Sequence, residues 1–103
     1  MSVEDTLPEV RQVFTLSPNA PNPFNAATSI RFDLYHAGDV SLVVYDTLGR
    51  VVKRLVGGHL NAGLHAVTWD GADNAGVPVS SGVYVYRLAS RGMAGSGRMT
   101  VVR

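Results

Sequence analysis

The segment from Thr28 to Leu34 reads Thr-Ser-Ile-Arg-Phe-Asp-Leu, in which apolar and polar side chains alternate. Successive side chains of a β-strand point to opposite faces, so Ile30, Phe32 and Leu34 share one face. The polar residues between them point the other way. This alternation is typical of a strand with one buried face, and it predicts a strand over Thr28–Leu34.

Six other stretches of the chain combine a β-rich composition with turn residues at both ends. Turn residues such as Asn22-Pro23, Gly57-Gly58 and Asp70-Gly71 recur mostly at intervals of about 8–12 residues, a spacing typical of a β-sandwich or barrel. No stretch combines helical periodicity with sufficient length. The predicted strands are Gln12–Ser17, Thr28–Leu34, Asp39–Asp46, Val51–Val56, His65–Asp70, Val83–Ala89 and Arg98–Val102.

The strand at Val83–Ala89 is apolar on both faces, which indicates a central position in a sheet. The connections are short enough for hairpins, and this excludes a βαβ fold. We therefore expect an all-β domain, a seven-stranded antiparallel sandwich of immunoglobulin or fibronectin type III kind. The residues predicted to face its core are Ile30, Phe32, Leu34, Val40, Leu42, Val44, His65, Val67, Trp69, Tyr84, Tyr86, Leu88, Met99 and Val101.

The length of 103 residues suits one domain, and the absence of cysteine excludes disulfides, thiolate metal sites and cysteine nucleophiles. A net charge of +1 argues against a nucleic-acid binder. No apolar run approaches the roughly 20 residues of a membrane-spanning helix, and no secretory signal opens the chain. Residues 1–10 are acidic and contain Pro8, so we expect a linker or cloning remnant there and the domain over residues 11–103.

No catalytic set is evident. The three histidines lack metal-ligand spacing: His36 and His59 lie beside predicted turn glycines, and His65 shares a face with Trp69. The glycine-rich stretch Gly92–Gly97 has neither the spacing of a nucleophile elbow nor a following helix to bind phosphate. A flexible connection between strands is expected there, and the protein is not expected to be an enzyme.

The chemistry of the side chains suggests two hypotheses of binding, one for calcium and one for carbohydrate. Asp70, Asp73 and Asn74 could surround a calcium ion with oxygen atoms, although Asp and Asn also stabilise turns without any ion, and no other cofactor is indicated. Exposed aromatic rings could bind carbohydrate, but alternation directs Trp69 and Tyr84 toward the core. Metal-free turns and core packing are the favoured interpretations.

Charge is distributed unevenly along the chain. Residues 1–51 hold three arginines against six acidic residues, a net charge of −3, whereas residues 52–103 hold six basic against two acidic residues, +4. From Arg87 onward the chain carries arginines and no acid. These arginines either protect an edge strand from aggregation or dock on an acidic partner or a phosphate-bearing glycolipid.

Several blocks of sequence together resemble a known family. The first runs from Leu16 to Asn25, Leu-Ser-Pro-Asn-Ala-Pro-Asn-Pro-Phe-Asn, and Thr28–Leu34 and Val40–Arg50 follow. Gly63–Gly71 and Ser81–Leu88 come later, in the same order. From about Phe14 to Arg103 the chain resembles the type A C-terminal sorting domain of type IX secretion substrates, and the related immunoglobulin-like domain of the flagellar hook-cap protein.

The resemblance implies a non-catalytic sorting and cell-surface attachment module at the end of a larger exported protein, located at the cell surface or outside the cell. Its implied partners are an upstream passenger domain, an outer-membrane translocon, a surface sortase and lipopolysaccharide. A structural immunoglobulin-like module is the alternative, and carbohydrate binding a third. The residues expected to contact the translocon are Arg98, Met99, Val101, Val102 and Arg103.

A second group of residues is expected to maintain the fold rather than to contact partners. Proline fixes φ and restricts the preceding residue, so the Asn-Pro pairs predict a rigid corner after which Phe24 closes one end of the sandwich. Gly49 is expected to adopt a positive φ in a hairpin turn. The group comprises Pro18, Asn22, Pro23, Phe24, Asn25, Gly49, Trp69, Gly82 and Tyr84.

Overall fold

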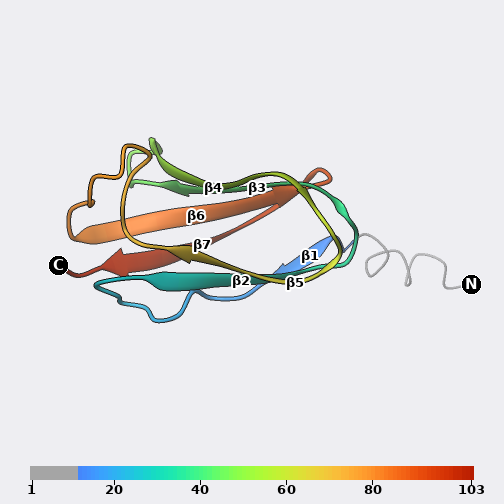
Figure 1. Ribbon diagram of the computed structural model, residues 1–103, viewed down its shortest axis with the longest axis horizontal. Coiled ribbons are helices and arrows are strands. Elements are labelled where there is room, and N and C mark those ends of the chain that lie inside the picture. The colour runs from blue at the N-terminus through green and yellow to red at the C-terminus, as the bar shows by residue number, and fades with distance from the viewer. Residues whose placement is uncertain (1–11) are drawn as a thin grey trace, which may run out of the picture.

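The computed structural model describes residues 12–103, in which seven strands form two antiparallel sheets packed face to face (Figure 1). The first sheet has the strand order β1-β2-β5 and the second β4-β3-β6-β7. The predicted all-β sandwich is therefore confirmed, and the predicted linker at residues 1–10 lies outside the described residues. The strands are β1 (Phe14–Leu16), β2 (Thr28–Leu34), β3 (Gly38–Tyr45), β4 (Val51–Leu60), β5 (Gly63–Trp69), β6 (Gly82–Ser90) and β7 (Met93–Val101).

The core lies between the two sheets and is built from the alternating positions of β2, β3, β6 and β7. β6 is paired on both sides, with β3 and with β7, so it is central as predicted. In β5 only Trp69 is fully buried, whereas His65 and Val67 are half-buried. No helix that could cross a membrane occurs in residues 12–103. Fully buried members of the core are Ile30, Phe32, Leu34, Leu42, Val44, Trp69, Tyr86, Leu88, Met99 and Val101.

β4 is longer than predicted. It continues through Gly57 and Gly58, where the sequence suggested a turn, and ends at Leu60. Gly57 pairs with Ser41 and Gly58 with Val40, so the glycines extend the ladder although they add no side chain to the alternation. His59 consequently lies within a strand and not beside a turn.

β7 also begins earlier than predicted, at Met93, because the glycine-rich stretch is part of the strand and not a flexible connection. Its glycines are explained by what lies against them. A Cβ atom at Gly97 would overlap the Tyr86 ring, and one at Gly95 would lie 3.2 Å from the Phe14 ring. The aromatic rings thus occupy the space that side chains of β7 would otherwise fill.

The two ends of the sandwich differ in their connections. At one end lie the long loops 17–27 and 70–81, the β3–β4 hairpin and the C-terminal residue Arg103 (Figure 1). At the other end the strands are joined by short turns, and the described chain enters there. Gly49, in the β3–β4 hairpin, has a φ of 82°, as its turn requires.

Candidate functional site

The Asn-Pro segment crosses from one sheet to the other. Ala20 still pairs with Ser29 of β2, through N–H···O distances of 2.9 and 3.0 Å. Phe24, in contrast, pairs with β7: its N–H donates to Thr100 O (3.0 Å) and its carbonyl accepts from Val102 N (2.9 Å). The segment therefore leaves the first sheet and forms a short parallel addition to the edge of the second.

Asn22 strengthens this addition with its side chain. Its Nδ2 donates to Arg98 O at 3.3 Å, and its Oδ1 accepts from Thr100 N at 2.9 Å. Both ends of one amide thus bind outward-pointing backbone groups of β7, as a neighbouring strand would. The C-terminal half of the edge of β7 is covered as a result.

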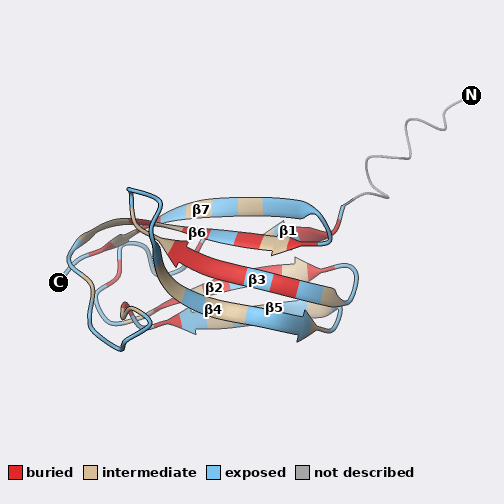
Figure 2. Cartoon of the chain, turned by 90° about the horizontal axis from the view of Figure 1, so that it is seen from above, coloured by how far each residue is buried: buried red, intermediate tan, exposed pale blue. Residues whose placement is uncertain are grey.

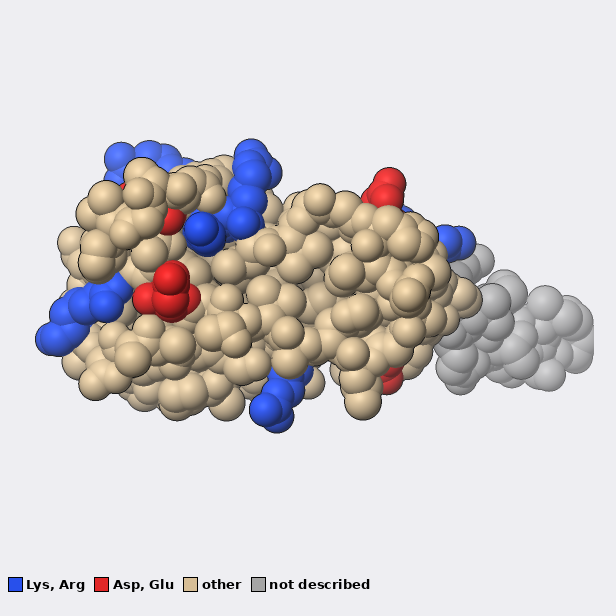
Figure 3. Space-filling view, in the orientation of Figure 1, with Lys and Arg blue, Asp and Glu red and all other residues tan. Residues whose placement is uncertain are grey.

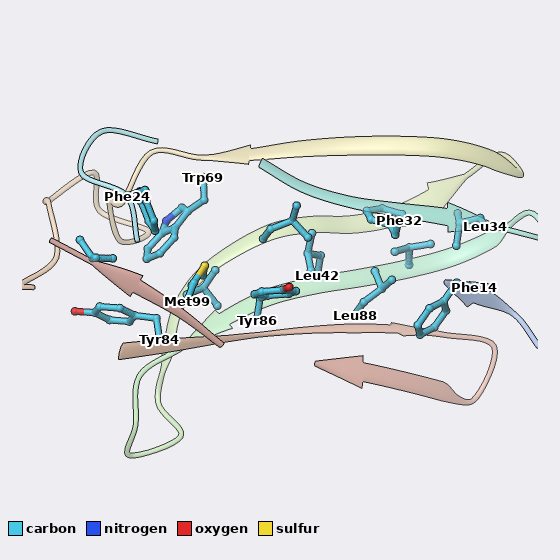
Figure 4. Close-up of a cluster of buried hydrophobic side chains, with 14 of the residues drawn as sticks. Phe14, Phe24, Phe32, Leu34, Leu42, Trp69, Tyr84, Tyr86, Leu88 and Met99 are labelled. Carbon is cyan, nitrogen blue, oxygen red and sulfur yellow. The ribbon is translucent and has the colours of Figure 1, made fainter. Parts of the chain in front are cut away.

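A column of aromatic rings fills the core beneath this addition. Phe24 meets Trp69 edge to face with ring centroids 5.6 Å apart, and Trp69 meets Tyr84 at 5.7 Å (Figure 4). The indole Nε1 donates to Ala72 O (2.9 Å), and the Tyr84 hydroxyl donates to Ser80 O (2.8 Å). The rings therefore anchor both ends of the 70–81 loop, since a buried polar atom must find a partner.

Arg103 ties the surrounding loops together. Its guanidinium donates to Val79 O (2.9 Å), Asn25 O (3.3 Å) and Gly71 O (2.6 Å), and its backbone N–H donates to Ser81 Oγ (2.8 Å). These acceptors belong to the 17–27 loop and the 70–81 loop. The fork of a guanidinium suits this task because it presents five donors in fixed directions.

We call the set formed by Asn22, Phe24, Trp69 and Arg103, together with residues 98–102 that they hold, the C-terminal clasp. An open groove of about 490 Å³ runs along it. The lining is mostly apolar, with the Arg103 side chain at one side. The residues that line the groove are Pro21, Pro23, Phe24, Asn25, Ala26, Ala27, Val102 and Arg103.

The five residues expected to contact a translocon are placed differently from one another. Met99 and Val101 are 1% exposed and belong to the core, as their alternation predicted, so in the folded domain their share in recognition would be to hold β7 in place; that role stays a prediction. Alternation explains this, because Arg98, Thr100 and Val102 take the outward positions. Arg98 and Val102 are exposed, and Arg103 lines the groove. A recognition role for these three residues stays a prediction.

The calcium candidates are occupied by backbone contacts. Asp70 Oδ1 accepts from Ala72 N, and Asp73 Oδ1 accepts from Ala75 N and Val77 N at 2.9 Å each. Asn74 Oδ1 accepts from Arg54 N, which joins the loop to β4. Among residues 12–103 no three His, Asp or Glu side chains are grouped as metal ligands. Calcium binding here stays a prediction, to be tested by titration with the ion.

The carbohydrate hypothesis depended on exposed aromatic rings. Trp69 is completely buried and Tyr84 is 9% exposed, so neither ring offers a platform to a sugar. Tyr35, at the opposite end of the sandwich, is exposed, and its hydroxyl hydrogen-bonds to the Thr15 hydroxyl.

Gly82, expected to maintain the fold, is the first residue of β6.

The Tyr86 hydroxyl is a feature that alternation alone did not reveal. It donates to Ser17 O and accepts from Asn19 N, both at 3.2 Å, and so holds the start of the Asn-Pro segment. Burial raises the pKa of this hydroxyl above its usual value, which extends the pH range over which it can donate toward the alkaline side. Pro18, between the two contacts, lines a small recess beside the tyrosine. A tyrosine predicted to be buried must find a partner for its hydroxyl, which is the signal that could have found it.

The chain is similar to proteins with known names. Over 48 residues it is 44% identical to the basal-body rod modification protein FlgD of Salmonella typhimurium, across 47% of this chain and 21% of that protein. It thus spans about a fifth of that relative's length.

Solved structures share the fold. Dimeric latent PorU from Porphyromonas gingivalis matches 87% of this chain and 9% of its own, with a TM-score of 0.70 and 24% identity. PorZ of the same organism, described as a surface component of the type IX secretion system, matches 85% of this chain and 11% of its own, with a TM-score of 0.60 and 22% identity. The model of the FlgD Ig-like domain family matches residues 19–93, most of the sandwich. The chain therefore belongs to the FlgD Ig-like domain family.

Proposed function

We propose that this domain is a non-catalytic sorting and cell-surface attachment module of a larger exported protein, recognised by the type IX outer-membrane machinery. One observation carries the proposal. Two blocks that lie far apart in the sequence, Pro18–Asn25 and Arg98–Arg103, form one surface in the C-terminal clasp. A machine that recognises a folded module needs such a surface, whose backbone is fixed before the encounter.

The groove of the clasp is the proposed contact surface for the translocon. Val102 is 49% exposed, and Pro21 and Pro23 are exposed beside it, so a partner would find apolar side chains on a rigid backbone. Arg98 adds positive charge at the border of this surface. The buried side chains of Met99 and Val101 would contribute indirectly, because they hold β7 against the core.

The two ends of the sandwich would serve two different neighbours. The described chain enters at the end opposite the clasp, so an upstream passenger domain would lie away from the translocon (Figure 1). On the face shown in Figure 3, more Lys and Arg side chains lie toward the end near the C-terminus than toward the other end, with Asp or Glu side chains among them. This distribution favours contact of the clasp end with anionic groups such as those of lipopolysaccharide. A surface sortase would act on the connection between passenger and domain.

The test is a fusion of residues 11–103 to a reporter protein in a host with type IX export. We expect Val102→Glu to reduce surface delivery of the reporter on the order of tenfold, which corresponds to about 1.4 kcal/mol of lost recognition. Leu64→Glu is the matched control, because Leu64 is 84% exposed on β5 away from the clasp. Circular dichroism of both purified variants checks that they fold. Delivery of the Val102→Glu reporter at the wild-type level would refute the proposal.

A structural interaction module is the second candidate, favoured by the 44% identity to FlgD over 48 residues. In this role the domain would pack against other subunits of an assembly without directing export. Deletion of residues 11–103 from the full-length protein distinguishes the two functions. Loss of assembly with normal export would support the structural role, and loss of export would support sorting.

A further inference from the structure

The edge of β7 is covered along only one of its halves. Thr100 N and O are bound by Asn22 and Phe24, so residue 100 directs its backbone groups away from β6. In an antiparallel pair every second residue directs both groups to the same side. Ala94 and Ser96 therefore also direct their N–H and C=O groups outward, and no described residue binds them.

The uncovered half is sterically open. Ala94 and Ser96 carry small side chains, and Gly95 and Gly97 between them carry none. β7 lies along the margin of the molecule, and its N-terminal half is mostly exposed (Figure 2). Nothing on these residues keeps a further strand from approaching to hydrogen-bonding distance, and edges are usually protected by lysine, proline or bulges.

A recess of about 190 Å³ lies beside this open edge on the side of the core. Leu16, Ser17 and Pro18 form one wall, the stretch Ser96–Arg98 forms the other, and Tyr86 lies between them. Its volume is several times the roughly 30 Å³ that a water molecule occupies in the liquid. The recess can therefore take one side chain from a strand paired with β7, namely a side chain that points inward.

The outward side of the same edge is basic. Arg87 pairs with Ser96 across β6 and β7, and Arg98 lies two residues further along β7 on the same face. Both arginines are exposed, and the sequence from Gly82 to Arg103 contains no acid. An added strand would place its outward side chains next to the short Ser96, within the field of both guanidinium groups.

From these features we infer that the edge from Ala94 to Arg98 binds an extended segment of another polypeptide by strand addition. The segment carries acidic side chains on its outward face and an apolar side chain that enters the recess. Main-chain hydrogen bonds supply affinity, and the recess and the arginines supply selectivity. This site lies outside the lining of the groove and does not depend on the sorting function, and Arg98, whose carbonyl is bound by Asn22, is the residue that it shares with the clasp.

The edge of β5 provides a matched comparison. Arg31 O accepts from Ser17 N, so the backbone N–H and C=O groups of Arg31 point away from β5. The backbone groups of its register partner Ala66 therefore point to the free side of β5. That edge therefore also offers outward N–H and C=O groups. Neither the recess of β7 nor its pair of arginines is present there. Binding at β5 would show that an open edge alone is sufficient.

The experiment follows backbone amides by NMR while a capped peptide of alternating valine and glutamate is added. We expect the signals of Ala94, Ser96 and Arg98 to shift and their N–H groups to exchange more slowly with solvent. The same peptide with lysine for glutamate is expected to bind on the order of tenfold more weakly. Perturbation of the β5 amides instead, or of no amides at all, would overturn the inference.

Two variants separate pairing from charge. Ser96→Pro removes an outward donor without touching the β6 ladder, and it should abolish binding, whereas Ala66→Pro on β5 should not. If Ser96→Pro does not fold, the charge variant decides: Arg87→Glu combined with Arg98→Glu should reverse the preference toward the lysine peptide. An unchanged preference would contradict the acidic partner, and wild-type binding by folded Ser96→Pro would contradict strand addition.

Discussion

The two ends of the sandwich are stabilised in different ways. At the clasp end, two long loops are held by hydrogen bonds from Asn22, Tyr84 and Arg103 and by the buried indole of Trp69. At the opposite end the connections are short turns, and single side chains contact them: the Arg91 guanidinium donates to Ala37 O at 3.2 Å, the His65 Nε2 lies 2.7 Å from Asn61 O, and the Tyr35 hydroxyl bonds to that of Thr15. The difference is one of number: each short turn is held by one side chain or two, whereas the two long loops are held by a connected set of side chains.

The clasp end also carries the features proposed for recognition. Loops held by side chains can present a groove with fixed geometry, and turns of two or three residues are too short to form one. If the long loops at this end kept their conformation without the clasp, removal of the clasp side chains would hardly change the free energy of unfolding. The predictions below measure that cost at one end and compare it with the other.

The largest effect is expected for Trp69→Ala. The substitution empties the centre of the aromatic column and should lower the free energy of unfolding by about 3–5 kcal/mol, out of a total of about 5–15 kcal/mol for a domain. Chemical denaturation followed by circular dichroism is the measurement, because Trp69 is the single tryptophan of the chain. Leu64→Ala, on the exposed face of β5, should change the value by less than about 0.5 kcal/mol. Equal effects of the two substitutions would contradict the importance of the column.

Arg103→Ala should have the next largest effect. It removes three donors to loop carbonyls, and we expect a loss of about 1–2 kcal/mol because these carbonyls can turn to water. Arg91→Ala removes one long contact at the other end and should cost less than about 0.5 kcal/mol. Hydrogen exchange should localise the Arg103 effect to the 70–81 loop. A uniform rise in exchange over the whole domain would argue against a local clasp.

Asn22→Ala should cost about 1 kcal/mol, since it removes both contacts of the amide with β7. Asn22→Asp keeps the acceptor for Thr100 N and loses only the donor to Arg98 O, so its loss should be smaller. Thermal unfolding of the two variants compares the contacts. A larger loss for the aspartate than for the alanine would show that the side chain does not bind as described.

The sheets could be predicted from the sequence because side-chain alternation depends only on strand geometry. β2 has the predicted bounds and faces, and the central position of β6 followed from its apolar character on both sides. The glycine-rich parts of β4 and β7 could not be predicted in the same way. Glycine contributes nothing to alternation, and the reason for Gly97 is the Tyr86 ring, which is brought there by the fold.

The clasp was beyond sequence reasoning for a related reason. The acceptors of Arg103 are backbone carbonyls of Asn25, Gly71 and Val79, and a carbonyl has no sequence signature. The proline-rich corner itself was expected, because proline restricts local backbone. Its contact with β7 joins residues more than seventy positions apart in the sequence. Such a contact forms only when both sheets are in place, so no local pattern predicts it.

The smallest effect is expected at the β3–β4 hairpin of the clasp end. Asp46 Oδ1 accepts from Arg50 N and Leu48 N, and Oδ2 forms an ion pair with the Arg50 Nε at 2.7 Å. The backbone hydrogen bond from Arg50 is the main cause that holds the pKa of this carboxyl below its usual value. Since the folded pKa is lowered, the stabilisation is present above the unfolded pKa of about 3.9 and is lost as the pH falls through the folded pKa.

Asp46→Asn keeps an oxygen that can accept from both backbone N–H groups but removes the titration. We therefore expect the melting temperature of the variant to fall less steeply than that of the wild type below about pH 4, and the two curves to run nearly parallel above about pH 5. Thermal unfolding across this range makes the comparison. The short turns at the opposite end, residues 35–37, 61–62 and 91–92, contain no acid, so an equally steep fall in both proteins would assign the acid sensitivity to carboxylates other than Asp46.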